Sequence, residues 1–433
     1  MFAGILPLPA GHVLVARDGR VKIDSWWDVP RDEVSSSSEA ELADELRALL
    51  DDSVKRRLPE DSAVGVFLSG GVDSAAVTAL SRRHTGTVKT FSLGFEEGGV
   101  YDELDDARRT AALLGTHHQE LRVGHPELHE RLDALNEHFD EPLGIASGFN
   151  MFVLGALARE EGVRVVMTGD GGDELFGGYR RHVADQFASA YQRLPRPLIE
   201  GAVPAALARL PRLGRTKQIA STLPIVDPVA RSVAWLEVLT PELRAELLQP
   251  GAAAGAVHHP TQVFAERAAA WNGAGGSLSR QLYVELKEWL PGTVFDRTAR
   301  ATTAHRLETR MPLFDHRIVA FAFRTPDQLK IRALATQRLL RRALHDVVPA
   351  HTLRKRKRGF TTPVDPWFRG PLAPFVREIL LDERTRWRGY FDSHVVERLW
   401  NEHASGRRIW DRALWLLMTF ELWHRAHVDR VRS

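Results

Sequence analysis

Two glycine-rich segments carry the residues best suited to chemistry in this sequence. The first, Ser69-Gly70-Gly71-Val72-Asp73-Ser74, follows the apolar run 63–68 and precedes small residues typical of a helix. Glycines let backbone N–H groups approach an anion closely, and a helix start adds a favourable dipole. The segment therefore predicts a phosphate-binding loop, although not a Walker A loop, since GxxxxGK(S/T) is absent. A turn capped by Ser and Asp, with no ligand, is the simpler alternative.

The second segment, Gly169–Tyr179, follows another apolar run at 163–167. It crowds Asp170, Asp173 and Glu174 among glycines, and such carboxylates repel one another unless a cation is near. Asp73 in the first segment would likewise repel phosphate, which suggests Mg²⁺ between carboxylate and phosphate oxygens. One carboxylate from each segment could bind the same ion. The alternative is that the second segment is a flexible acidic loop without a metal.

The elements around these segments must place them at one edge of a sheet. The sequence predicts strands at 63–68, 88–93, 119–123 and 163–167, alternating with helices that start at Ser74, Asp105 and Met151. This alternation predicts an α/β fold, a parallel sheet flanked by helices, with ligands at the carboxyl ends of the strands. The strand pattern ends near residue 180, so the C-terminal half should be largely helical.

Composition narrows the class of protein. Of 433 residues, 58 are Lys or Arg and 56 are Asp or Glu, a formal net charge of +2 that gives no reason to expect nucleic acid as a partner. There are no cysteines, which excludes disulfides, thiolate metal sites and a cysteine nucleophile. No apolar run reaches the roughly 20 residues of a membrane-spanning helix, and no targeting signal stands at the start. We expect a cytoplasmic protein without membrane contact.

The first segment resembles the pyrophosphate loop of the N-type ATP pyrophosphatases, and adding Gly169–Tyr179 narrows the resemblance to the asparagine synthetase family. Three further stretches agree with that family in the same order. They are Phe91–Phe95 with Tyr101-Asp102-Glu103, Leu307–Arg317, and Arg356–Phe360 with Pro363 and Trp367. The basic run Arg354–Arg358, which alone would suggest a nucleic-acid patch, then fits an active-site loop better.

The resemblance implies an ATP- and Mg²⁺-dependent ligase of the HUP-like ATP pyrophosphatase fold, which adenylates a carboxylate, releases pyrophosphate and passes the acyl group to an amine. By motif position, the residues expected to bind the phosphates are Ser69, Gly70, Gly71, Asp73 and Ser74. Those expected to bind the metal are Asp73 and Asp173, and those expected to contact adenosine are Leu68, Ser92 and Gly169. The residues expected to act in catalysis are Lys357 and Asp170. Asp170 favours the asparagine synthetase type over lactam-forming relatives, which carry a tyrosine there.

Three departures from the family pattern concern the nitrogen donor and the substrate. Residues 1–34 resemble only the end of the family's glutaminase domain plus a linker, ahead of a synthetase domain at 35–433. Residue 2 is Phe, so we expect free ammonia, another amine or a separate glutaminase subunit as the nitrogen source. The family's DRxSM stretch is matched either by Arg300 without a gap or by Asp296-Arg297 with three extra residues. Gln337 stands where a lysine often occurs.

The leading hypothesis is therefore an asparagine synthetase-type ligase that acts on small molecules, with aspartate as the expected carboxylate. A natural-product amide or macrocycle synthetase, similar to a lasso-peptide cyclase, would use the same acyl-adenylate chemistry. A degenerate, non-catalytic binding subunit is the alternative of another class.

Overall fold

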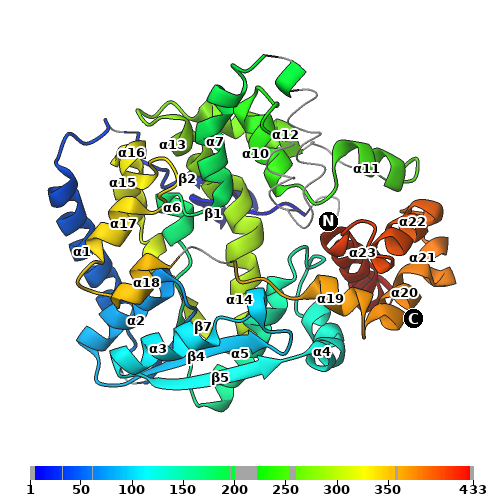
Figure 1. Cartoon of the computed structure of the whole chain (residues 1–433), viewed down its shortest axis with the longest axis horizontal. Coiled ribbons are helices and arrows are strands. Elements are labelled where there is room, and N and C mark those ends of the chain that lie inside the picture. Colours follow the sequence, from blue (N-terminus) through cyan, green and yellow to red (C-terminus); the bar gives the residue numbers. More distant parts are fainter. Residues whose placement is uncertain are drawn as a thin grey trace.

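A five-stranded sheet with all strands parallel lies at the base of the molecule in Figure 1. The computed structural model describes residues 5–31, 33–60, 62–195, 197–199, 222–252, 260–355 and 359–429. The strands are Val64–Phe67 (β3), Val88–Phe95 (β4), His117–Val123 (β5), Val165–Met167 (β6) and Glu308–Arg310 (β7). The first four coincide with the predicted strands, so the parallel α/β sheet is confirmed.

The fifth strand contradicts the expectation that strands end near residue 180. Glu308–Arg310 pairs in parallel with β6, with Val165 opposite Glu308 and Met167 opposite Arg310. Its three residues, Glu-Thr-Arg, contain no apolar side chain, and they occupy an edge where only one neighbour is needed. No apolar or alternating pattern marks such a strand in the sequence.

The strand order β5-β4-β3-β6-β7 creates a topological switch between β3 and β6. From β3 the chain proceeds outward on one side through β4 and β5, and then returns to the other side of β3 as β6. Connections that leave neighbouring strands in opposite directions open a crevice at the carboxyl ends of those strands. The two glycine-rich segments follow β3 and β6, so both lie at this crevice.

Helices cover both faces of the sheet. Successive side chains of a strand point to opposite faces, so neighbouring residues of one strand belong to different apolar cores. Val66 joins a core with α1 (Glu39–Arg56) and α2 (Val72–His84). Its neighbour Phe67 joins a second core with α5 (Ser147–Glu160) and the C-terminal helices. The central strands β3, β4 and β6 are therefore buried between two apolar layers.

The second half of the chain is largely helical, as expected. The other helices of the described residues are α3 (Leu104–Leu114), α4 (His125–Glu137), α6 (Gly172–Phe176), α7 (Arg180–Tyr191), α10 (Pro228–Leu236), α11 (Pro241–Leu247), α12 (Pro260–Ala270), α15 (His316–Arg324), α16 (Asp327–Lys330), α17 (Arg338–Ala343), α18 (Ala350–Arg354), α19 (Val364–Arg369), α20 (Ala373–Leu381), α21 (Glu383–Trp387), α22 (Ser393–Ala404) and α23 (Asp411–His424). Within the described ranges, no helix combines the length and apolar character that crossing a membrane requires.

A nearly continuous helical run spans residues 277–303 and in Figure 1 leads from the upper part of the molecule down to the sheet. It begins with α13 (Ser277–Val284), passes through two π-helical turns, Glu285–Trp289 and Pro291–Phe295, and ends with α14 (Asp296–Thr303). Pro291 lacks an amide N–H, which is one reason for irregular winding at this point. The run presents Glu285 and Arg297 toward the segment that follows β6, as described below.

The N-terminal strands form a separate antiparallel hairpin of His12–Arg17 (β1) and Arg20–Ser25 (β2). The hairpin does not join the five-stranded sheet, and its side chains are mostly exposed on both faces. Contacts at its base attach it, since Lys287 Nζ donates to the carbonyl of Ala10 and to Asp28 Oδ1.

Candidate active site

The first glycine-rich segment folds into a compact loop between β3 and α2. Ser74 Oγ accepts a hydrogen bond from the backbone N–H of Ser69 at 3.0 Å, and Ser69 Oγ accepts one from Gly71 N–H at 3.1 Å. The two hydroxyl groups also lie 3.0 Å apart. Gly71 occupies the N-cap of α2, where it provides no capping side chain. The loop therefore presents glycine backbone at the start of a 13-residue helix, the arrangement that suits a phosphate group.

The second segment packs directly against the first, and it does so through glycines. A Cβ atom on Gly169 would lie 2.4 Å from the backbone nitrogen of Ser74. A Cβ atom on Gly172 would lie 2.1 Å from Asp73 Oδ1. No side chain fits at such distances, so glycine at these positions allows the two loops to touch.

Asp73 and Asp173 meet at a single amide group. The Nε2 atom of Gln337 donates to Asp73 Oδ1 at 3.0 Å and Oδ2 at 3.2 Å, and to Asp173 Oδ1 at 2.9 Å. The two carboxylates are therefore no more than about 6 Å apart, because both lie within hydrogen-bond distance of one nitrogen atom. Both side chains are buried. The arrangement brings the two acidic residues of separate loops to one point.

This pair of carboxylates fits a magnesium ion that is shared with a nucleotide. Among the described residues, no group of three or more His, Asp or Glu side chains is placed to hold a metal by itself. Mg²⁺ in nucleotide enzymes is usually bound by one or two carboxylates together with phosphate oxygens and water. A site with two carboxylates beside a phosphate loop matches that requirement.

Hydrogen bonds within the second segment hold its short helix α6 in place. Glu174 Oε2 accepts from the backbone N–H of Gly171 at 2.9 Å, and the Tyr179 hydroxyl donates to Glu174 Oε1. Burial and the nearby charges of Glu174 and Asp173 raise the pKa of Tyr179 well above its usual value. Tyr179 therefore remains protonated and keeps donating to Glu174 at physiological pH.

A buried ion cluster anchors this segment to the 277–303 run. Glu285 is fully buried, and its carboxylate accepts from Arg181 Nε at 3.0 Å and Nη2 at 2.7 Å. His182 Nε2 lies 3.2 Å from Glu285 Oε2. Burial would raise the pKa of Glu285, but the charges and hydrogen bonds of Arg181 and His182 outweigh burial and lower it. Glu285 is therefore ionised and fixes the start of α7, directly after Tyr179.

Asp170 has an arginine partner. Thr168 Oγ1 donates to Asp170 Oδ2 at 2.7 Å, and Arg297 Nη2 lies 3.5 Å from Asp170 Oδ1. Arg297 Nη1 also donates to Ser147 Oγ at 3.1 Å. Arg300 instead pairs with Asp296 and Asp140. Of the two arginines that could match the family's DRxSM stretch, Arg297 is the one beside Asp170, which favours the alignment with three extra residues.

The structure brings most of the predicted site residues to one edge of the sheet. Ser92 Oγ, in the middle of β4, donates to the carbonyl of Leu68, the residue directly after β3, at 2.5 Å. The residues gathered at the edge are Leu68, Ser69, Gly70, Gly71, Asp73, Ser74, Ser92, Gly169, Asp170 and Asp173. Lys357 lies outside the described residues, so its place in the site stays a prediction.

Two residues at the site were not predicted as members of it. Gln337 was noted only as a departure from the family pattern. Lys355 lies over the phosphate loop, because a Cβ atom on Gly70 would be 2.2 Å from its Nζ atom. That nitrogen lies 2.8 Å from Glu103 Oε1 and 2.6 Å from Asp106 Oδ2. The basic run was the available signal for Lys355, but no spacing singled out this lysine within it.

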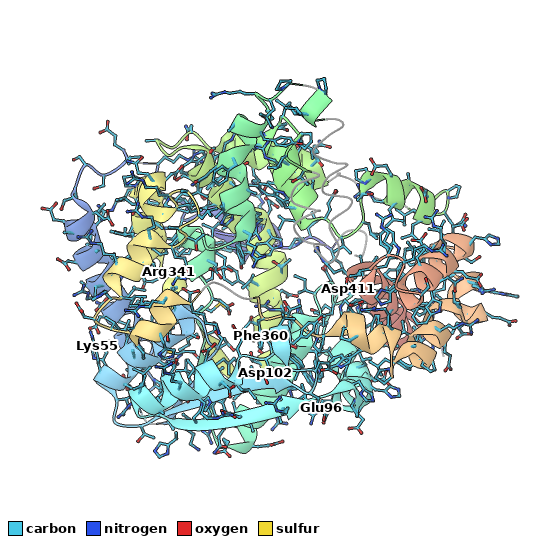
Figure 2. All side chains as sticks on the ribbon, viewed as in Figure 1. Lys55, Glu96, Asp102, Arg341, Phe360 and Asp411 are labelled. Carbon is cyan, nitrogen blue, oxygen red and sulfur yellow. The ribbon has the colours of Figure 1, made fainter. Side chains whose placement is uncertain are left out.

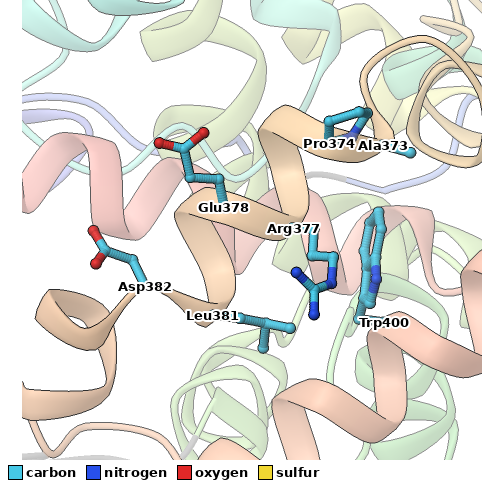
Figure 3. Close-up of a pocket in the computed structure, with 7 residues that line it drawn as sticks. All are labelled: Ala373, Pro374, Arg377, Glu378, Leu381, Asp382 and Trp400. Atoms are coloured by element: carbon cyan, nitrogen blue, oxygen red, sulfur yellow. The ribbon is translucent and has the colours of Figure 1, made fainter.

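A surface hollow elsewhere does not belong to this site. It has a volume of roughly 700 Å³ and lies along α20, with Arg377 and Trp400 on its wall (Figure 3). None of the predicted site residues that the structure describes lines it. The candidate active site is therefore the crevice at the carboxyl edge of the sheet and not this hollow.

Comparison with known proteins agrees with the residue pattern. The family model described as asparagine synthase matches residues 45–425. The glutamine-hydrolyzing asparagine synthetase 1 of Bacillus subtilis is 27% identical over 424 residues, which are 98% of this chain and 65% of that protein. An asparagine synthetase homologue of Mycobacterium tuberculosis is 31% identical over 404 residues, 92% of this chain and 59% of that protein.

The chain thus spans less than two thirds of the length of these two relatives. Among solved structures, the NMN synthetase of Francisella tularensis aligns with 34% of this chain and 61% of its own, at 23% identity and a TM-score of 0.24. That score is too low to bear on fold or function. The extent of the family match, by contrast, covers most of the chain, and the chain belongs to the asparagine synthase family.

Proposed function

We propose that this protein is an ATP-dependent amide-forming ligase that adenylates a carboxylate, with aspartate as the first candidate substrate, and transfers the acyl group to ammonia or another amine. The observation that carries the proposal is the meeting of Asp73 and Asp173 at Gln337, beside the loop of Ser69–Ser74. Two carboxylates at a phosphate loop suit Mg·ATP and few other ligands.

In the proposed reaction the chain supplies binding and electrostatic stabilisation. Residues 69–74 bind the β- and γ-phosphates through backbone N–H and hydroxyl groups, and the adjacent backbone at Leu68, Ser92 and Gly169 receives the adenosine. Asp73 and Asp173 would hold Mg²⁺, which would supply positive charge that offsets the charge of the phosphates. The substrate carboxylate attacks the α-phosphate, so a C–O–P bond forms as the bond to pyrophosphate breaks.

Asp170 and Lys357 are proposed to act in the amide-forming half of the reaction. The attacking amine forms a C–N bond to the acyl carbon as the C–O bond to AMP breaks, and its surplus proton passes to the surrounding water. Asp170, held by Thr168 and Arg297, is proposed to orient the amine and acyl groups. A cation at Lys357 would stabilise charge on the phosphate and on the tetrahedral intermediate, a contribution worth about 3 kcal/mol in comparable sites.

The nitrogen source is proposed to be ammonia, another amine or a separate glutaminase subunit. The hairpin at 12–25, which has no sheet partner beyond itself among the described residues, supports the interpretation of residues 1–34 as the end of a glutaminase-type domain. Residues 35–433 would then be the synthetase domain.

The test is to incubate the protein with ATP, Mg²⁺ and aspartate, together with either ammonium or glutamine, and to detect asparagine, AMP and pyrophosphate by mass spectrometry. We expect products with ammonium and none with glutamine. If the protein binds Mg·ATP tightly but forms no AMP with aspartate, its substrate is another carboxylate, as in a natural-product synthetase. Absence of Mg·ATP binding would contradict the proposal and support a non-catalytic subunit.

A further inference from the structure

Gln337 joins the two acidic loops although it comes from a distant part of the chain. Its amide donates to both carboxylates of the proposed metal pair, and its side chain is buried, with 1% of the residue exposed. We propose that Gln337 is a positioning residue that holds Asp73 and Asp173 at the spacing that Mg²⁺ requires, and that Arg341 orients its amide. This role rests on the proposed function, because it concerns the same metal site.

The orientation of the amide follows from a second contact. Arg341 lies on α17, one helical turn beyond Gln337, at the place labelled in Figure 2. Its Nη2 atom donates to Gln337 Oε1 at 3.2 Å. A guanidinium group can only donate, so the amide oxygen must face Arg341 and the amide nitrogen must face the carboxylates. Arg341 thereby fixes which end of Gln337 meets the acidic pair.

Arg341 also connects this pair to the phosphate loop. Its Nη1 atom donates to the carbonyl of Leu353 at 2.6 Å, at the end of α18. Lys355, two residues later, lies over Gly70. A chain of contacts therefore runs from the carboxylates through Gln337 and Arg341 to the segment that places a lysine at the phosphate loop.

The backbone at Gln337 is held in a conformation that a glutamine seldom adopts. Its φ of 52° lies in the left-handed region, at the N-cap of α17. Such a conformation persists only where neighbouring packing imposes it. Leu339 and Leu340, which follow Gln337 in α17, are fully buried. The strained backbone directs the side chain between the two loops.

An amide suits this position because it donates two hydrogens and carries no net charge. Gln337 can hold both carboxylates without adding a positive charge that would repel a divalent cation. Residues that orient metal ligands in this way typically change metal affinity by about 10- to 100-fold when they are replaced.

The experiment compares Gln337→Leu and Arg341→Met with matched controls, in which a nearby glutamine or arginine is replaced by the same residue. Gln328→Leu and Arg342→Met serve as controls, because Gln328 is exposed and Arg342 pairs with Glu39 on the surface. Mn²⁺ binding in the presence of a non-hydrolysable ATP analogue is measured by electron paramagnetic resonance. The Mg²⁺ dependence of pyrophosphate release and the thermal unfolding temperature are measured in parallel.

We expect Gln337→Leu to weaken Mn²⁺ binding by about tenfold, and Arg341→Met to weaken it in the same direction but less. Turnover of Gln337→Leu should recover at saturating Mg²⁺, whereas a general loss of structure would not be rescued by the ion. Both controls should bind Mn²⁺ as the unaltered protein does. If Gln337→Leu does not fold, Arg341→Met decides the matter.

The positioning role would be overturned if Gln337→Leu bound Mn²⁺ as tightly as the unaltered protein does. If Gln337→Leu does not fold, the same result in a folded Arg341→Met would overturn it. That outcome differs from failure of the proposed function, in which the unaltered protein itself would bind no metal–nucleotide complex.

Discussion

At the scale of single residues, the site depends on glycines, which have no side chain, as much as on its polar side chains. Gly169 and Gly172 lie where any Cβ atom would overlap the first loop, at Ser74 and at Asp73. The glycines therefore decide how near the second carboxylate can come to the first. The pattern of serine, glycine and aspartate made a loop between β3 and α2 predictable from the sequence, whereas its binding of phosphate stays a prediction.

Gly172→Ala should weaken metal binding by displacing the Asp73 carboxylate. The added methyl group would overlap the Asp73 carboxylate, and a carboxylate displaced from its ligand position costs about tenfold or more in metal affinity. Gly86→Ala is the matched control, because no atom lies within 4 Å of the added methyl group. Mn²⁺ titration with an ATP analogue checks both variants. Equal affinity in Gly172→Ala and Gly86→Ala would contradict the close packing of the loops.

Gln337 and Lys355 show where prediction from the sequence ended at this scale. Both lie far along the chain from the phosphate loop, and their neighbours are determined by how α17 and α18 pack against α1 and α2. Residue type and spacing reveal a loop that acts locally. They do not reveal which distant side chain the fold delivers to it.

At the scale of elements, the stretch Leu307–Arg317 acts as a structural junction. Asp315 caps α15 by accepting from Arg317 N–H at 2.9 Å, and its other oxygen accepts from Arg57 Nη1, at the end of α1, at 2.9 Å. The same stretch contains β7, the short edge strand that no sequence pattern indicated. Buried apolar strands such as β3 were predictable because hydrophobic burial leaves a run in the sequence, whereas β7 is specified by its pairing with β6.

Asp315→Asn should destabilise the protein by about 2 kcal/mol at pH 7, because a charged acceptor for two arginines is lost. Burial would raise the pKa of Asp315, but hydrogen bonds from Arg317 and Arg57 outweigh burial and hold it below its usual value of 3.8. The stabilisation is therefore fully present above about pH 4 and is lost as the pH falls toward the folded-state pKa.

Urea unfolding at pH 7 and at pH 3 checks this expectation, with the exposed pair member Asp346 changed to Asn as a control. The difference between Asp315→Asn and the unaltered protein should shrink at pH 3. A difference that grew as the pH fell would contradict the sign of the pKa shift.

At the scale of the whole molecule, the N-terminal hairpin stands apart from the two cores. Val15 is 51% exposed and Val21 is 63% exposed, whereas Val66 of β3 is fully buried. What the hairpin packs against could not be predicted, because its strands pair only with each other among the described residues.

Replacing Val15 and Val21 together by serine should change the free energy of unfolding by no more than about 1 kcal/mol, as is usual for exposed positions. Val66→Ser should cost at least about 2 kcal/mol, because it leaves a cavity and buries a hydroxyl group in the sheet. Urea unfolding of the three proteins makes the comparison. Equal losses would contradict the separation of hairpin and core.

The central claim is that Asp73 and Asp173 together bind the metal of Mg·ATP at the edge of one sheet. Calorimetric titration with a non-hydrolysable ATP analogue, with and without Mg²⁺, tests it most directly in the unaltered protein, Asp73→Asn and Asp173→Asn. We expect Mg²⁺ to tighten nucleotide binding in the unaltered protein and to have little effect in either variant, while all three remain folded. An equal effect of Mg²⁺ on all three proteins would contradict the claim.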